Sequence, residues 1–147
     1  MEEKHSRSVE DYIEVIYKLV REKGYARVSD ISLALKVQPP SVTEMLKKMY
    51  EQGLVVYERY RTIKLSEKGE ELAKKVLRKH EILFDFLILL GIDEKKAEED
   101  ACRAEHFFHP ETIMRIKILT EILKSTTSGS KLLSKFWFLC KNESKPL

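Results

Sequence analysis

Apolar residues recur at helical spacing near the start of the chain. They are Tyr12, Ile13, Ile16, Tyr17 and Val20. Their spacing of three and four residues predicts a helix over about residues 9–22 with one apolar face. Ser8 and Asp11 have the spacing of a capping pattern at its start, and Gly24 is placed to end it.

Two further helical segments precede residue 54. Ser29 is placed to cap a short helix that includes the apolar stretch ISLAL. The segment KVQPPS then breaks this helix. Pro39 and Pro40 suit the first turn of the next helix, where a missing N–H group costs nothing. The pattern therefore predicts a third helix over SVTEMLKKMYEQG, which Gly53 closes.

The hydrophobic period changes from helical to alternating within LVVYERYRTIKLS. Two short β-prone runs, residues 54–57 and 62–65, flank a polar turn at 58–61 and predict a small hairpin. Helix, short helix, sharp turn, helix and hairpin is the order of a winged helix-turn-helix. We therefore expect a mainly α fold that begins with a winged helix-turn-helix and its small β-hairpin wing.

The second half of the chain has a helical pattern. Ser66 is placed to cap a long helix that Gly91 stops, Asp93 to cap a fifth helix through about Phe108, and Pro110 to open a sixth. We interpret STTSGS as a linker that precedes an apolar patch in a tail. The predicted domains are a DNA-binding domain over 1–72, a helical domain over 73–124 and a tail of unassigned role over 125–147.

Composition narrows the class of protein. The chain has 147 residues, 43% hydrophobic and 35% charged, which fits one domain or two small ones that share a core. A net charge of +3 argues only weakly for a nucleic-acid partner, so that case depends on local charge. Two cysteines make no disulfide framework, the charged N-terminus is no signal peptide, and the longest apolar run is too short for a bilayer. We expect a cytoplasmic protein with no membrane partner.

The third predicted helix and the hairpin supply candidate contacts to double-stranded DNA. In a helix-turn-helix the third helix lies in the major groove, and a basic, aromatic wing tip suits phosphates or the minor groove. The candidate DNA-binding residues are Gln38, Pro40, Ser41, Thr43, Glu44, Lys47, Arg59, Tyr60 and Arg61. A small helical domain with solvated charges is the simpler alternative, and the order of elements favours DNA binding over it.

The first helix and the long helix carry polar residues that suit a metal ion. Asp11 and Glu14 are three residues apart and share a helix face, and His80 stands where the long helix turns from polar to apolar. Each has an ordinary alternative. A carboxylate pair at this spacing is usually a solvated stripe, and a histidine near an apolar stretch is usually structural.

The fifth predicted helix carries three more potential ligands. Cys102, Glu105 and His106 fall at i, i+3 and i+4, so they share one face. All six side chains together offer oxygen, nitrogen and sulfur donors, a mixture that fits a first-row divalent transition metal. A lone cysteine is more often a small buried residue, and the Glu-His pair also fits a helix surface. The metal interpretation requires the three helices to meet, which spacing does not establish.

The chain resembles the metal-dependent repressors of the diphtheria-toxin-repressor and manganese-transport-regulator family in their two-domain form. The resemblance extends from about residue 8 to 122 through EDYIEVIYKL, GYARVSDIS, PPSVTEML, LVVYERYR, LSEKG, RKHEIL and DACRAEH. It implies a winged helix-turn-helix followed by a helical domain that binds metal and forms a homodimer. It also implies that the metal lies between the first, the long and the fifth helix. The tail after Ser125 lies outside the resemblance.

Residue by residue, the resemblance implies a metal site of mixed type. Asp11, Glu14 and His80 match ligands of the manganese-type members, and Glu105 and His106 match a pair common to the manganese and iron types.

Cys102 matches the iron type, where the manganese type has glutamate, whereas the iron type has methionine in place of Asp11. Phe84 and Glu98 stand where the iron type has the acid and the histidine of an ancillary site. Hard carboxylate donors favour Mn(II) or Fe(II), and the cysteine favours softer ions. We expect Mn(II), then Fe(II), with Zn(II) or Co(II) as further alternatives.

These assignments predict a metal-dependent repressor that controls metal-homeostasis genes. Metal would neutralise the clustered acidic ligands, tie the first helix to the second domain, and so set the spacing of two recognition helices in a homodimer. Three rivals stay open: a winged-helix regulator that senses no metal, a redox sensor that uses Cys102, and a hydrolytic metalloenzyme. The absence of HExxH and of a Gly-rich phosphate loop leads us to expect no enzymatic activity.

Overall fold

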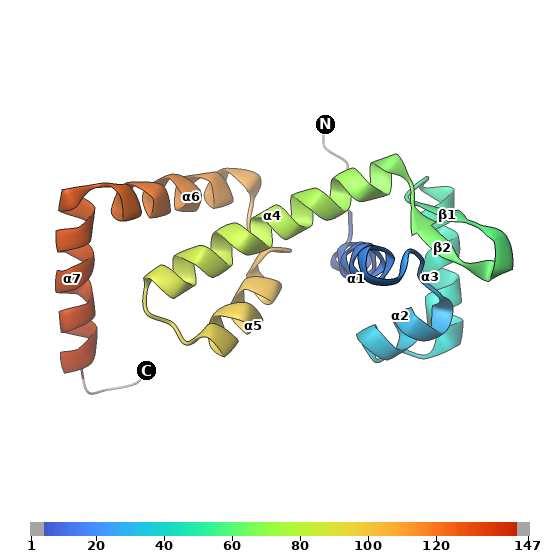
Figure 1. Ribbon diagram of the computed structural model, residues 1–147, viewed down its shortest axis with the longest axis horizontal. Coiled ribbons are helices and arrows are strands. Elements are labelled where there is room, and N and C mark those ends of the chain that lie inside the picture. Colours follow the sequence, from blue (N-terminus) through green and yellow to red (C-terminus); the bar gives the residue numbers. More distant parts are fainter. Residues whose placement is uncertain (1–4, 144–147) are drawn as a thin grey trace. The chain divides into compact units, whose positions relative to one another are not determined.

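The computed structural model describes residues 5–143. Over that range the chain forms seven α-helices, one 3-10 helix and one two-stranded hairpin, as the mainly α expectation requires (Figure 1). The elements are α1 (Arg7–Lys23), α2 (Val28–Leu35), α3 (Pro39–Glu51), β1 (Val55–Tyr57), η1 (Arg59–Arg61), β2 (Ile63–Leu65), α4 (Glu67–Leu89), α5 (Glu94–Ala104), α6 (Pro110–Ser125) and α7 (Thr127–Asn142).

The chain divides into two compact units, Met1–Leu77 and Arg78–Leu147, and α4 contributes to both. We describe each unit by itself. The boundary that the sequence suggests, between residues 72 and 73, stays a prediction.

One buried apolar cluster holds the helices of the first unit around the hairpin. Ile13 and Ile16 of α1 pack in it with Ile31 of α2, Leu46 of α3 and Ile63 of β2, and all five are fully buried. Burial of each such side chain stabilises the fold by roughly 1.5–3 kcal/mol. The cluster holds α1, α2 and α3 together with the hairpin and leaves the outer face of α3 to solvent.

The hairpin is short and forms a backbone hydrogen bond with the segment between α1 and α2. β1 and β2 are antiparallel, with Val55 opposite Leu65, and the backbone N–H of Ala26 donates to the Ile63 carbonyl at 3.0 Å. At the wing tip Tyr60 and Arg61 have φ of 61° and 57°. This left-handed conformation costs free energy in residues other than glycine.

Two helix starts in the first unit differ from the sequence prediction. Ser6, not Ser8, caps α1, because its Oγ accepts from the Val9 N–H at 3.4 Å. The helix therefore begins at Arg7, about two residues earlier than predicted, and Val9 is buried. α2 begins at Val28 without a side-chain cap, so Ser29 lies inside it. The end of α1 at Gly24, with φ of 84°, is confirmed.

The second unit contains the C-terminal part of α4 with α5, α6 and α7. Leu83 of α4, Ala101 of α5 and Ile113 of α6 form its buried core. Asp93 caps α5 as predicted, because its Oδ1 accepts from two backbone N–H groups at 3.1 and 3.4 Å. The predicted extension of this helix to Phe108 is wrong. α5 ends at Ala104, whose carbonyl accepts from both of the N–H groups at 107 and 108 in a tight turn.

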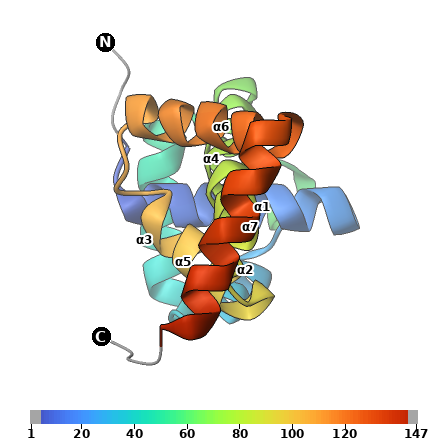
Figure 2. The same cartoon turned by 90° about the vertical axis from the view of Figure 1, so that its left-hand side faces the viewer.

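The predicted linker over STTSGS is also wrong. α6 reaches Ser125 and α7 begins at Thr127, at a sharp corner that Figures 1 and 2 show from two sides. Thr126 caps α7 by accepting from the Gly129 N–H at 2.9 Å. Trp137 of α7 donates its indole N–H to the Leu89 carbonyl at 3.0 Å, so α7 packs within the second unit. No helix among the described residues is long and apolar enough to cross a membrane.

Candidate metal centre and DNA-reading surface

His80 of α4 lies between two carboxylates of the second unit. Its Nδ1 is 2.8 Å from Glu105 Oε2, and its Nε2 is 3.0 Å from Glu98 Oε2. The Glu105 side chain is 1% exposed and the Glu98 side chain 55%. The hydrogen bond to Glu105, with a smaller contribution from Glu98, raises the pKa of His80 to about 9 against the opposing effect of burial. The ring therefore carries a proton at neutral pH in this arrangement, and a metal ion would displace that proton.

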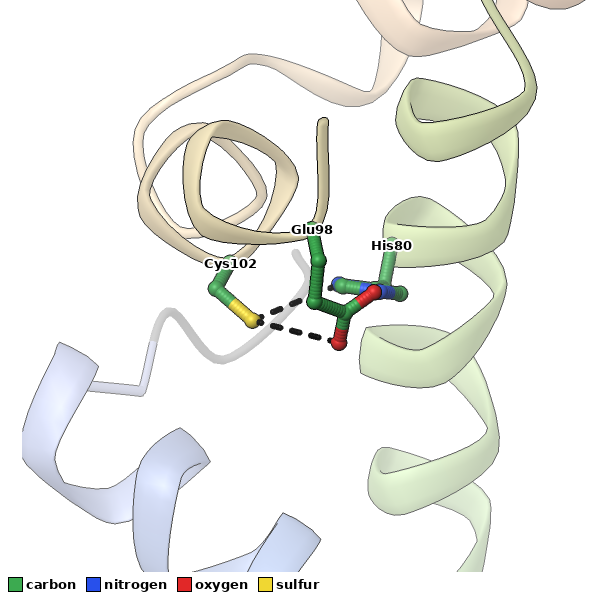
Figure 3. Close-up of side chains that lie close together, drawn as sticks. All are labelled: His80, Glu98 and Cys102. Carbon is green, nitrogen blue, oxygen red and sulfur yellow. Dashed lines mark hydrogen bonds and ion pairs between the residues drawn. The ribbon is translucent and has the colours of Figure 1, made fainter. Parts of the chain in front are cut away.

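Cys102 adds a sulfur atom to the same cluster. Its Sγ is 3.8 Å from His80 Nδ1 and 3.9 Å from Glu98 Oε1. Figure 3 shows the sulfur atom and the Glu98 carboxylate, both from α5, beside the imidazole from α4. One donor atom from each of the three residues lies within 4.8 Å of the other two. Nitrogen, oxygen and sulfur donors this close together fit a divalent transition metal.

His106 completes the group that surrounds Glu105. Its side chain is 2% exposed, and its Nε2 is 3.4 Å from Glu105 Oε1. Because α5 ends at Ala104, Glu105 is the residue that caps the helix and His106 lies beyond it. The shared helix face expected from spacing is therefore only partly right. The structure nevertheless brings His80, Cys102, Glu105 and His106 together in one unit.

The two acidic residues of α1 lie in the first unit. Glu14 Oε1 accepts from Lys18 Nζ at 2.8 Å, and Asp11 Oδ2 is 3.9 Å from Arg7 Nε. Both pairs have i,i+4 spacing on α1, which puts a cation beside each carboxylate. That Asp11 and Glu14 join the ligands of the second unit stays a prediction.

Glu98 is the one member of the cluster that sequence reasoning did not place among the ligands. The family resemblance identified it only as a substitution at an ancillary site. A signal was present, because Glu98 precedes Cys102 by four residues and therefore lies on the same face of α5.

The candidate DNA-binding residues of the first unit are at its surface. Val42, Leu46 and Met49 of α3 are fully buried, which turns the opposite side of this helix outward. The exposed residues of that side and of the wing tip include Gln38, Pro40, Ser41, Thr43, Glu44, Lys47, Arg59, Tyr60 and Arg61. Tyr60 is 88% exposed at the tip.

An open recess beside the wing has a basic and aromatic lining. Arg27, Arg59 and Lys64 surround it with the rings of Tyr57 and Tyr60, and Glu58, which also lines it, pairs with Lys64 at 3.0 Å. Guanidinium and ammonium groups bind phosphates, and tyrosine hydroxyls donate to them. The cationic and tyrosine side chains of the recess therefore suit a DNA backbone.

Family models match most of the chain. A model described as the iron dependent repressor N-terminal DNA binding domain covers residues 4–63, and one described as the metal binding and dimerisation domain covers 66–132. The chain belongs to the iron-dependent repressor family. This membership confirms the family resemblance, and with it a metal-dependent, DNA-binding transcriptional repressor that is not an enzyme.

Individual relatives agree with this family. The chain is 45% identical over 126 residues to an HTH-type transcriptional regulator MntR of Lysinibacillus sphaericus, covering 86% of this chain and 91% of that one. Among solved structures it is similar to T. acidophilum IdeR (31% identity, TM-score 0.67) and to the manganese regulator SloR (29%, 0.65). These two alignments cover 73% and 74% of this chain and 51% of each solved chain, so the chain spans about half of their length.

Proposed function

We propose that this repressor responds to Mn(II) in the cytoplasm and controls genes of metal homeostasis as a homodimer on an operator in double-stranded DNA. The proposed ligands are Asp11, Glu14, His80, Cys102, Glu105 and His106. The observation that carries the proposal is the buried Glu105 carboxylate, which contacts the imidazoles of both His80 and His106.

The donor set supports a divalent ion of the first transition row. Three carboxylates and two imidazoles are donors that Mn(II) and Fe(II) accept, and the Cys102 thiolate favours Fe(II), Zn(II) or Co(II). A similar solved structure is described as a manganese regulator. We therefore rank Mn(II) first and Fe(II) second, with Zn(II) or Co(II) as further alternatives for the same site.

The residues of the second unit would hold the ion, and Asp11 and Glu14 of α1 would complete its ligand set. A bound divalent ion supplies positive charge to an acidic cluster. His80 would then lose its proton to solvent, and Asp11 and Glu14 would contact the ion in place of Arg7 and Lys18. Since α1 and α3 share the buried core of the first unit, restraint of α1 would also restrain the helix that reads DNA.

An apolar surface on α6 supports the homodimer. Met114, Ile118, Leu119 and Ile122 are each about half exposed, although each could be buried against a second subunit. In a dimer the two copies of α3 read half-sites about one helical turn apart, and their spacing depends on the restraint of α1. Metal and DNA then stabilise each other's binding, typically by 5- to 150-fold.

The test is DNA affinity at buffered free metal concentrations. Duplexes are first selected from a random-sequence library with the Mn(II)-loaded protein, and fluorescence anisotropy then measures their affinity with Mn(II), Fe(II), Co(II), Zn(II) or EDTA. We expect tighter binding with Mn(II) than with EDTA, and no such gain in Glu105→Gln. Glu99→Gln is the control, because Glu99 is an exposed acid on α5, the helix that Glu105 caps.

Two outcomes would contradict the proposal. Equal affinity in EDTA and in every metal would indicate a winged-helix regulator that senses something else. Loss of DNA binding on reversible oxidation of Cys102, with the metal retained, would indicate a redox sensor.

A further inference from the structure

We propose that Glu98 is a metal ligand, and that His80, Glu98 and Cys102 form a thiolate-containing subsite carried entirely by α4 and α5. This inference rests on the proposed function, since it assigns a further ligand and a softer ion to the same cluster. Its consequence is that the second unit takes a divalent ion without the carboxylates of α1.

The donor atoms of the three residues lie close enough to share one ion after small side-chain rotations. Zinc and similar ions bind nitrogen, oxygen and sulfur at about 2.0–2.3 Å, so neighbouring donors in a four-coordinate site lie roughly 3.3–3.8 Å apart. Here Cys102 Sγ is 3.8 Å from His80 Nδ1 and 3.9 Å from Glu98 Oε1, and Glu98 Oε2 is 3.0 Å from His80 Nε2. One donor atom from each residue lies within 4.8 Å of the other two, which is somewhat wider than the spacing around a bound ion. Small side-chain rotations would direct one donor of each residue at a common point (Figure 3).

Rigid elements hold these donors in place. Glu98 and Cys102 are one turn apart on α5, and Ala101 between them is fully buried against Leu83 of α4. Leu83 lies three residues beyond His80, so the same helix contact places the imidazole opposite both donors of α5. The Glu98 side chain is half exposed, which leaves it free to turn toward an ion.

The composition of the subsite determines which ion it takes. One thiolate, one imidazole and one carboxylate are a softer set than the carboxylates of α1 with Glu105 and His106. Such a set selects Co(II), Zn(II) or Fe(II) over Mn(II). The subsite therefore gives the second unit an affinity for thiolate-binding ions that a plain oxygen-rich manganese site would lack.

The experiment uses the full-length, reduced protein and Co(II) as the probe. A cobalt–thiolate bond produces a charge-transfer band in the near ultraviolet, which reports on Cys102 directly. We expect the band in the unchanged chain and in the double variant Asp11→Asn, Glu14→Gln, and its loss in Cys102→Ser. Glu98→Gln should weaken the Co(II) affinity read from this band by about tenfold or more, whereas Glu99→Gln should not.

Either an unchanged Co(II) affinity in Glu98→Gln or loss of the band in the double variant of α1 would overturn the inference. Absence of the band from the unchanged chain would overturn it as well. Circular dichroism of each variant verifies that it folds. Mn(II)-dependent DNA binding, measured on the same samples, distinguishes failure of the proposed subsite from failure of the proposed function. If that binding persists while Glu98→Gln has no effect, the subsite is wrong and the metal-dependent repressor stands.

Discussion

Replacement of Glu105 by glutamine probes the centre of the cluster through stability. The carboxylate is buried and lies 2.8 Å from His80 Nδ1, where it is the main cause of the rise in the His80 pKa from 6.5 to about 9. A rise of that size corresponds to roughly 3 kcal/mol of stabilisation of the protonated ring. We expect Glu105→Gln to lose about 2–3 kcal/mol of that stabilisation in EDTA-treated protein, since Glu98 supplies the remainder.

The loss depends on pH in a defined direction. Folding raises the pKa of His80, so the stabilisation is complete below pH 6.5 and disappears as the pH rises through about 9. The difference in unfolding free energy between the unchanged chain and the variant should therefore be largest near pH 6.5 and shrink toward pH 9. Glu98→Gln should cost less than Glu105→Gln because the Glu98 side chain is 55% exposed and solvent screens its pair.

The assay is urea unfolding in EDTA, followed by the fluorescence of Trp137. This residue is the sole tryptophan of the chain, and its hydrogen bond to Leu89 makes it a reporter of the second unit. Glu99→Gln is again the control and should stay within about 0.5 kcal/mol. If Glu105→Gln lost the same free energy at pH 6.5 and pH 9, the loss would come from packing and not from the proton on His80.

Three further predictions concern the rest of the molecule. Gly69→Ala should destabilise the first unit by about 1–3 kcal/mol in thermal unfolding, because the added Cβ would meet the Leu54 carbonyl oxygen. Alanine in a helix is usually more stable than glycine by about 1 kcal/mol, so a gain of that size would show that α4 has room for the Cβ. Arg59→Gln should reduce the slope of log affinity against log salt by about 0.9 for each wing that touches a DNA phosphate, and an unchanged slope would place Arg59 away from the backbone. Mn(II) affinity should rise about tenfold for each pH unit between 6.5 and 9 through His80 alone, because the metal displaces the proton of the imidazole. Isothermal titration in two buffers that differ in ionisation enthalpy would detect the released proton. If no proton were released, the assignment of His80 as a ligand would be contradicted.

The sequence predicts the architecture of the first unit well, because its signals are local. The paired prolines at 39 and 40 and Gly24 mark helix ends by backbone geometry alone, and the structure confirms each. The capping prediction for Ser8 is wrong because Ser6, two residues earlier, can also cap the helix, and burial of Val9 favours the earlier start. The prediction for Ser29 is wrong because α2 begins without a side-chain cap. Local capping and tertiary contact also explain why residues 127–142, predicted as part of a linker and tail, form the helix α7. Thr126 caps this helix, and Trp137 donates a hydrogen bond to the Leu89 carbonyl.

The candidate site is predictable only in part for the same reason. Helical spacing puts Cys102 near Glu105, but it does not bring either residue to His80, which is more than twenty residues away in sequence. That contact depends on α4 packing against α5 through Leu83 and Ala101. Glu98 is not predicted as a ligand because an exposed glutamate in a charged helix is ordinary until a partner from another helix lies beside it.

The most direct test of the account is whether a divalent metal controls DNA affinity through the ligands of the second unit. Anisotropy titrations of the selected duplex, with and without Mn(II), should show a gain in affinity of at least fivefold in the unchanged chain and in Glu99→Gln. The gain should disappear in Glu105→Gln, with EDTA-level DNA affinity retained. An equal gain in Glu105→Gln would contradict the account.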